Sequence, residues 1–155
     1  MTGKAEVDRQ RQQLDATFKR AANINADAEL ISDFARHLCV LVSGFLEQAV
    51  IEYLIEYARI HSDARVQQHV EKRLRHLTNL SSQRLIDTIG GFDSDWRRDM
   101  ELFLVDELKD AVNGIVDLRN HIAHGKYVGI TMVRVQNYYD RIKIVVEHIG
   151  VLCGV

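Results

Sequence analysis

Several features that would assign a protein to a class are missing from this sequence. Its 155 residues include no proline and only two cysteines, Cys39 and Cys153. Two cysteines are too few for a disulfide framework, and Cys39 lies within an apolar run, so we expect it to be a small core residue. The formal net charge of −2 excludes a strongly basic nucleic-acid binder, although it allows a site that needs only a local positive field.

Signals for export, membrane insertion and bound cofactors are also missing. Residues 1–13 lack the apolar stretch of a signal peptide, and the most apolar window, Leu38–Ile51, is too short and too polar to span a membrane. We therefore expect a cytoplasmic protein with no membrane contact. His61, His69 and His76 lack the spacing of a metal site, and no glycine-rich phosphate loop occurs, so no metal or cofactor is expected.

What the sequence has throughout is helical spacing of apolar residues, without the alternation of a half-buried strand. We predict an all-α, up-and-down bundle of about five to six helices. The expected helices cover approximately residues 4–22, 28–60, 66–77, 82–90, 94–122 and 132–152. By its length the chain is expected to form a single domain, 1–155, in which the polar opening helix within residues 1–25 is partly mobile.

Capping residues locate the starts of three of these helices. Ser81 or Ser82 can cap the fourth helix, Ser94 is the expected N-cap of the fifth, and Thr131 is the expected N-cap of the last. Within the fifth helix, apolar residues step by three or four from Trp96 to Ile122. We therefore predict that this helix is unbroken.

Charge is unevenly distributed along the chain, although the total is nearly balanced. Residues 65–84 and residues 119–143 each carry five Lys or Arg and one acid, a local balance of +4. Between them, residues 87–110 carry eight acids and three bases, a balance of −5. Solvated helix faces explain such segments most simply. The second basic segment, however, also contains a motif with the residue types of a catalytic site.

This motif is Arg119-Asn-His-Ile-Ala-His124, at the end of the fifth predicted helix. Asn120 and His124 are four residues apart and share a face if the helix continues that far, whereas Arg119 and His124 are five apart, about 140° around an ideal helix. Arg119 and His124 can therefore converge on one ligand only if the helix ends near Ala123 or if two chains each contribute part of the site. Gly125 favours the first alternative, because glycine permits a left-handed helix stop.

The side chains of the motif suit the cleavage of a phosphodiester bond without a metal. A histidine can take the proton from a ribose 2′-hydroxyl or give one to the leaving 5′-oxygen, and an arginine can stabilise the charge of the transition state. Asn120 can hold a phosphate oxygen or fix the tautomer of the histidine. A single site lacks a second histidine, which a symmetric dimer would supply. Taken alone, Arg119 and His124 are more simply interpreted as a helix cap.

The surrounding sequence resembles a known family. Arg119–Gly125 resembles the Arg-Asn-x-x-x-His signature of the HEPN superfamily (higher eukaryote and prokaryote nucleotide-binding domains), and the chain is similar to its RiboL-PSP branch over roughly residues 30 to 150. Further segments that carry the similarity are Phe45–Glu47, Lys72–Leu74, Gly91–Asp93, Trp96, Glu107–Val116, Ile130–Val135 and Tyr138–Tyr139. The resemblance implies an all-α bundle, a homodimer with the motif at its interface, and endoribonuclease activity of the kind found in toxin and antiviral defence proteins.

The resemblance also implies roles for individual residues. Arg119 and His124 would carry catalysis, with Asn120 in support. The expected substrate-binding residues are His121, Lys126 and Tyr127. Some relatives carry a modified tyrosine two residues after the histidine; that position is Lys126 here, so regulation by adenylylation is not expected.

One acidic residue outside the motif is a candidate supporting residue. Glu47 interrupts an apolar face of the second predicted helix, so we expect it to be buried and to pair with Arg119 or another base. Two interpretations are open, a purely structural ion pair and a role in positioning Arg119.

The leading hypothesis is a metal-independent endoribonuclease of the toxin or defence type, with RNA as substrate and a homodimer as the working form. The alternative is a non-catalytic dimerisation or protein-interaction module, or a subunit of a larger defence complex. An antitoxin or another protein encoded by a neighbouring gene is a candidate partner in both cases.

Overall fold

The computed structural model describes residues 2–155, which form seven α-helices and no β-strand. The helices are α1 (Gly3–Ala22), α2 (Ala28–His61), α3 (Ala64–Leu74), α4 (Ser82–Gly90), α5 (Ser94–Phe103), α6 (Asp106–Ala123) and α7 (Met132–Cys153). The predicted all-α class is confirmed. There is one helix more than the upper end of the expected range, because one predicted helix is divided in two.

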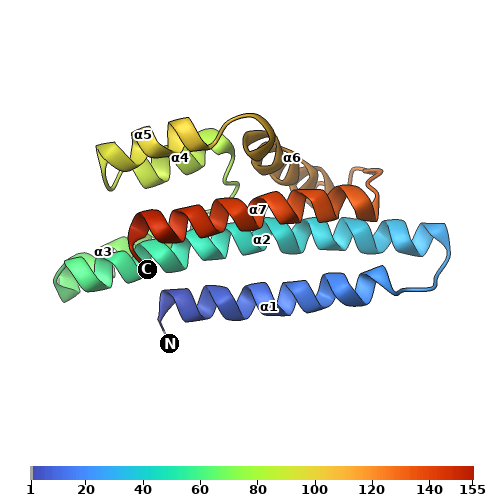
Figure 1. The fold of residues 1–155 in the computed structure, drawn as a ribbon, viewed down its shortest axis with the longest axis horizontal. Coiled ribbons are helices and arrows are strands. Elements are labelled where there is room, and N and C mark those ends of the chain that lie inside the picture. Colours follow the sequence, from blue (N-terminus) through green and yellow to red (C-terminus); the bar gives the residue numbers. More distant parts are fainter. Residues whose placement is uncertain (1) are drawn as a thin grey trace.

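The three longest helices, α1, α2 and α7, lie side by side along the longest dimension of the molecule, with α1 antiparallel to the other two (Figure 1). α6 packs against α2 and α7, while α4 and α5 pair with each other and α3 packs on α2. Both chain termini lie towards the α3 end of the bundle, and the turn between α6 and α7 lies at the other end (Figure 1). This arrangement places the motif beside the N-terminal half of α2.

Side-chain oxygens begin α4, α5 and α7. Ser81 and Thr131 cap α4 and α7 as predicted, their hydroxyl oxygens accepting from backbone N–H groups three residues later at 3.3 and 3.1 Å. The N-cap of α5, however, is Asp93 and not Ser94, and its carboxylate accepts from the N–H of Asp95 at 2.6 Å. A carboxylate also carries negative charge to the positive end of the helix dipole, which favours Asp93 as the cap.

The predicted unbroken helix over Trp96–Ile122 is wrong, because the chain turns between α5 and α6. Phe103 ends α5, Val105 is extended, and Asp106 has a φ of 50°, a left-handed conformation that aspartate tolerates better than most residues. The ring of Phe103 stacks on His148 of α7, with centroids 3.6 Å apart. Apart from this contact, α5 packs mainly on α4, whereas α6 packs on α2 and α7. The apolar spacing continues through the turn and therefore does not reveal it.

α2 is the central helix of the bundle. By length and composition alone it could cross a membrane, contrary to the expectation from Leu38–Ile51, but 67% of its most apolar window is buried inside the protein. A helix that is apolar on all sides is typical of a core helix covered by several neighbours.

Both cysteines are free and buried. Loss of water around the thiols raises the pKa of Cys39 to about 11 and that of Cys153 to about 12. The prediction that Cys39 is a core residue is therefore confirmed.

The opening helix packs on the bundle through the apolar residues that the sequence indicates. Val7, Leu14 and Phe18 are buried, and Phe18 stacks on Tyr139 of α7 with ring centroids 4.5 Å apart. The hydroxyl of Tyr139 donates to the carboxylate of Asp15 at 2.5 Å. α1 is therefore connected to α7 as well as to α2, and the partial mobility of residues 1–25 stays a prediction.

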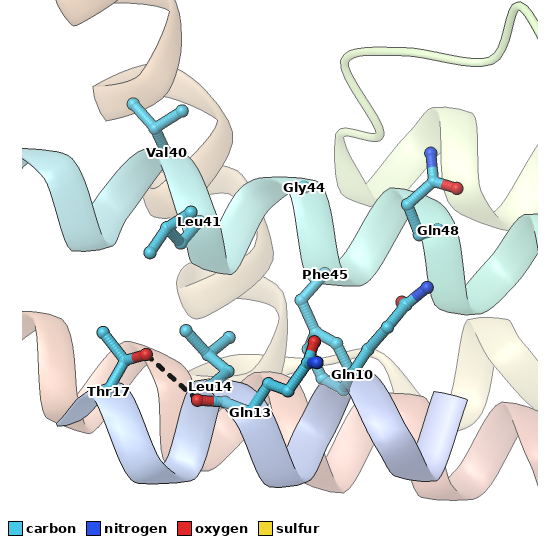
Figure 2. A pocket seen from close by; sticks show the side chains of 9 residues that line it. All are labelled: Gln10, Gln13, Leu14, Thr17, Val40, Leu41, Gly44, Phe45 and Gln48. Atoms are coloured by element: carbon cyan, nitrogen blue, oxygen red, sulfur yellow. Dashed lines mark hydrogen bonds between the residues drawn. The ribbon is translucent and has the colours of Figure 1, made fainter. Parts of the chain in front are cut away.

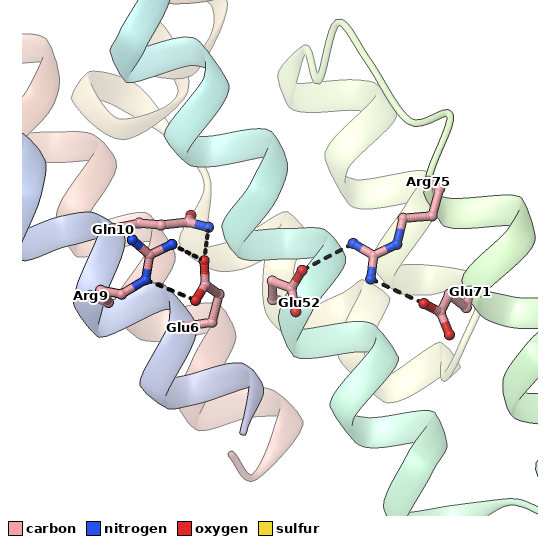
Figure 3. A network of polar contacts seen from close by, with 6 residues as sticks. All are labelled: Glu6, Arg9, Gln10, Glu52, Glu71 and Arg75. Atoms are coloured by element: carbon pink, nitrogen blue, oxygen red, sulfur yellow. Dashed lines mark hydrogen bonds and ion pairs between the residues drawn. The ribbon is translucent and has the colours of Figure 1, made fainter. Parts of the chain in front are cut away.

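Ion pairs connect α3 to α2. Arg75, directly after α3, donates to Glu52 of α2 at 3.0 Å and to Glu71 of α3 at 3.1 Å (Figure 3). A separate polar cluster around Glu6 lies within α1 in the same view. The pairs around Arg75 hold the end of α3 against α2, and with it the start of the α3–α4 turn, which carries Asn79.

Candidate active site at the end of α6

α6 ends as the sequence predicts, at Ala123, with His124 as its C-cap. Gly125 has a φ of 72° and donates its N–H to the carbonyl three residues earlier at 3.1 Å, while the N–H of Lys126 donates to the carbonyl of His121 at 2.9 Å. These two bonds form a Schellman motif, the common glycine-dependent helix stop. The imidazole of His124 is therefore presented at a turn and not on the body of the helix.

Arg119 is half-buried one turn earlier. Its Nη1 donates to Oδ1 of Asn79, in the turn between α3 and α4, at 3.1 Å, and more weakly to Oδ1 of Asn120 at 3.4 Å. Within residues 2–155 the guanidinium has no carboxylate within 4.0 Å. Because only neutral oxygens hold it, its positive charge is still available to an anion.

Asn79 is itself held by a buried carboxylate. Its N–H donates to Oε1 of Glu47 at 3.1 Å, and Glu47 is only 9% exposed. Asn79 has a φ of 54°, in the left-handed region where asparagine is favoured over most residues. The predicted burial of Glu47 is confirmed, but the predicted ion pair is wrong for the part of the chain described. The α3–α4 turn comes between the two side chains, so Glu47 is connected to Arg119 through Asn79.

The N–H of His124, the C-cap of α6, donates to the carbonyl of Asn120 at 3.0 Å, so a helical backbone bond joins these two residues. The side-chain oxygen of Asn120 is directed to Arg119, and no hydrogen bond joins it to the histidine ring in residues 2–155. His121 and His124 are both exposed. The end of α6 and its C-cap thus present an arginine, an amide and two solvent-accessible imidazoles.

Arg36 of α2 contacts the turn that follows α6. Its guanidinium lies 5.1 Å from the centre of the Tyr127 ring and donates to the carbonyl of Val128 at 3.4 Å. Tyr127 is 82% exposed, and Lys126 is also exposed. The structure therefore places Lys126 and Tyr127, two of the three predicted substrate-binding residues, on the surface next to His124.

The charges around this turn are only partly neutralised. Of the five cations in residues 119–143, Arg141 and Lys143 pair with carboxylates at 3.6 and 3.3 Å. Arg119, Lys126 and Arg134 form no ion pair with any residue that the structure describes. The end of α6 and the start of α7 therefore provide a local positive field suited to phosphate.

The motif lies on an open surface. Three hollows lie elsewhere on the surface. One of about 400 Å³, between α1 and α2, is lined by glutamines and apolar side chains (Figure 2). Another of about 240 Å³ lies between α1 and α7, and a third of about 760 Å³ lies where α2, α3 and α4 meet. None of these three includes a motif residue. Residues 2–155 also contain no group of three or more His, Cys, Asp or Glu side chains placed to hold a metal ion. A reaction at the motif needs a second surface to shield it from water.

The fold and the site together define a class of protein. It is an all-α bundle with a buried central helix, beside which an Arg-Asn-x-x-x-His segment lies at a helix end stopped by a glycine. The RiboL-PSP-HEPN family model matches residues 6–153, nearly the whole chain. The protein therefore belongs to the RiboL-PSP-HEPN family, which is associated with ribonuclease activity, and the resemblance in sequence is confirmed. No curated protein and no solved structure gives a significant match.

Two residues that contact the site are not predictable from the motif. Asn79 lies 40 residues before Arg119, and Arg36 lies 92 residues before the carbonyl that it contacts. The only local signal for Asn79 is the preference of asparagine for left-handed turns. Contacts over such separations depend on how the helices pack, which the spacing of one helix does not specify.

Proposed function

We propose that the protein is a metal-independent endoribonuclease whose active site is assembled from the α6 ends of two copies. The observation that carries the proposal is the pairing, within one helix end, of an arginine with an unneutralised charge and a histidine exposed on a glycine-stopped turn. The association of the family with ribonuclease activity supports it. A toxin or defence role would follow from uncontrolled RNA cleavage in the cell.

In the proposed reaction His124 acts as the general base and removes the proton of a ribose 2′-hydroxyl. The 2′-oxygen forms a bond to the adjacent phosphorus, and the bond from phosphorus to the 5′-oxygen breaks. Arg119 stabilises the negative charge on the non-bridging oxygens, and a second imidazole protonates the leaving 5′-oxygen. The products are a 2′,3′-cyclic phosphate and a 5′-hydroxyl end.

The second imidazole is proposed to be His124 of a second copy, related by a two-fold axis. The exposed motif favours this arrangement, because one chain alone leaves the reacting groups open to water. Tyr127 and Val133 flank the motif and are 82% and 71% exposed, so they provide apolar surface for a second copy to cover. Lys126 and His121 are then placed to contact the RNA on either side of the cleaved bond.

Cleavage of RNA by the purified protein in the presence of EDTA tests the catalytic assignment. We expect 2′,3′-cyclic phosphate ends, and a loss of about 10² to 10⁴ in kcat for His124→Ala, the usual contribution of general acid–base catalysis. His69→Ala, an exposed histidine on α3, is the control and should cleave like the wild type. If His124→Ala cleaves as fast as the wild type, the site is assigned wrongly.

Sedimentation combined with activity tests the shared site. Val133→Asp, at the start of α7, is expected to convert dimers to monomers and to reduce RNA cleavage in parallel. Val151→Asp is the matched control, because Val151 is 74% exposed at the other end of the same helix. A wild-type protein that cleaves RNA as a monomer would contradict the dimeric site while leaving the role of His124 in place.

A further inference from the structure

The largest of the three hollows lies away from the motif, where α3 and α4 meet the C-terminal end of α2. It is an open groove of about 760 Å³. Its apolar lining includes Val66, Val70, Leu74, Leu77 and the rings of Tyr57 and Phe92. No residue of the motif borders it, so it has no part in the reaction proposed above.

The floor of this groove is an apolar helix face that the rest of the chain covers only in part. The four aliphatic residues from Val66 to Leu77 are spaced by three and four, which places them along one side of α3 and its extension. In a fully covered helix such a stripe is buried, but only Leu74 is buried in α3, and Val66 is 50% exposed. α3 is nevertheless well connected, because Arg75 pairs with Glu52 of α2 (Figure 3).

The rim of the groove carries charge of one sign. Arg73 from α3 and Arg84 from α4 line it together with His61 and His69, and no Asp or Glu is among its lining residues. Neither arginine forms an ion pair in residues 2–155, whereas Arg75, just after α3, pairs with two carboxylates. The cations at the rim are thus left for a ligand that comes from outside the chain.

We propose that this groove is the docking site for an acidic amphipathic helix of a partner protein. The apolar residues of such a helix, at positions i, i+4 and i+7, lie on the floor provided by α3, and Asp or Glu residues on its flanks pair with Arg73 and Arg84. α3 is 11 residues long, about 16 Å, which matches two to three turns of a partner helix.

The chemistry of the floor favours a helix over RNA as the occupant. A base placed on the aliphatic stripe loses water from its hydrogen-bonding edge, and Val70, Leu74 and Leu77 offer no group to replace that water. The apolar face of a helix has no such groups to satisfy, because its backbone is bonded internally. The acidic flanks stay at the rim, where they are partly solvated and still attracted by the arginines.

Two surface-displayed peptide libraries test the proposal. Each peptide is an amphipathic sequence about 15 residues long, which is long enough to be partly helical on its own. Both vary the apolar positions among Leu, Ile, Met and Phe; one carries Glu on the flanks and the other Lys. We expect the wild-type protein to enrich the Glu library at least about tenfold over the Lys library, since close charge pairs at interfaces commonly contribute this much. The variant with both Arg73→Glu and Arg84→Glu should reverse this preference.

A matched double variant separates the groove from general charge. Arg65→Glu with Lys72→Glu makes the same change in charge on α3, at residues that do not line the groove, and should keep the preference for Glu flanks. Circular dichroism confirms that both variants fold, and all four altered residues are exposed. Equal enrichment of the two libraries by the wild type, or equal effects of the two double variants, overturns the proposal.

Two further measurements identify a different occupant. If labelled single-stranded RNA binds the wild type and is lost with Arg73→Glu/Arg84→Glu but not with the control, the groove is an RNA site and the proposal fails. If self-association in sedimentation is lost with the same variant alone, the occupant is a second copy, and the proposal also fails. Neither result affects the assignment of His124, which is tested separately by RNA cleavage.

Discussion

Residues 65–84, from α3 to the start of α4, and residues 119–143, from the end of α6 into α7, carry the same local charge, +4, yet present it in different ways. In the first, Arg73 and Arg84 border an apolar groove. In the second, Arg119 and Lys126 surround an exposed helix end that lies outside the three hollows described. A groove suits a ligand that buries apolar surface, whereas an exposed helix end suits a compact anion such as a phosphate. Equal charge in the sequence therefore does not indicate equal function.

The largest expected effect is on RNA cleavage. Arg119→Ala should reduce kcat by about 10² to 10³ because the transition-state charge loses its main stabilising group. The Arg73→Glu/Arg84→Glu variant should leave kcat within about twofold of the wild type, since the groove does not contact the reacting atoms. Steady-state kinetics on one RNA substrate measure both. Equal losses in the two variants would remove the functional distinction between the regions.

The next effect concerns Asn79, which connects the α3–α4 turn to the candidate active site. Both Asn79→Gly and Asn79→Ala remove the oxygen that holds Arg119, so kcat should fall roughly 10- to 100-fold in each. They differ in stability: glycine adopts the φ of 54° freely, while alanine should lose about 1 kcal/mol more free energy of unfolding. Urea unfolding alongside kinetics measures the two effects. If kcat falls only in Asn79→Ala, the less stable of the two variants, the role of Asn79 is only structural.

A smaller effect separates the two regions by their salt dependence. If Lys126 contacts phosphate, Lys126→Ala should reduce the slope of log KM against log salt concentration by about 0.7, the value for one contact to a single strand. Lys72→Ala, an exposed lysine on α3, should leave the slope unchanged. The measurement is KM at several salt concentrations. A change of slope with Lys72→Ala would place RNA on the α3 side of the molecule as well.

The smallest effect is on the turn after α6. Arg36→Ala removes the contact with the Tyr127 ring and the bond to the carbonyl of Val128, and should lower the free energy of unfolding by about 0.5 to 1 kcal/mol. Hydrogen exchange should become faster in residues 125–130 and stay unchanged in residues 75–81. Faster exchange in both segments would indicate that the two regions are mechanically coupled.

The sequence predicts those features of the fold that depend on residues close together in the chain. The stop of α6 follows from Gly125, which alone can take the left-handed conformation without strain, and the start of α7 follows from Thr131. The motif was therefore placed correctly at a helix end. The family could also be recognised, because its segments are spread over most of the chain.

Features that depend on tertiary packing could not be predicted from the sequence. The turn between α5 and α6 contains Leu104, Val105 and Asp106, with no glycine or proline to indicate it, and it forms because the two helices pack on different neighbours. The burial of Glu47 could be predicted from the apolar face that it interrupts. Its actual partner could not, because the N–H of Asn79 reaches it only through the path of the α3–α4 turn.

The two buried thiols have a practical consequence for locating the second copy. With pKa values of about 11 and 12, Cys39 and Cys153 are almost fully protonated at pH 7.5 and inaccessible to alkylating reagents. A single cysteine introduced at an exposed position, such as Asn137 on α7, can thus carry a spin label selectively in an otherwise native background. Pulsed electron paramagnetic resonance on that protein would measure the distance between two labelled copies in solution.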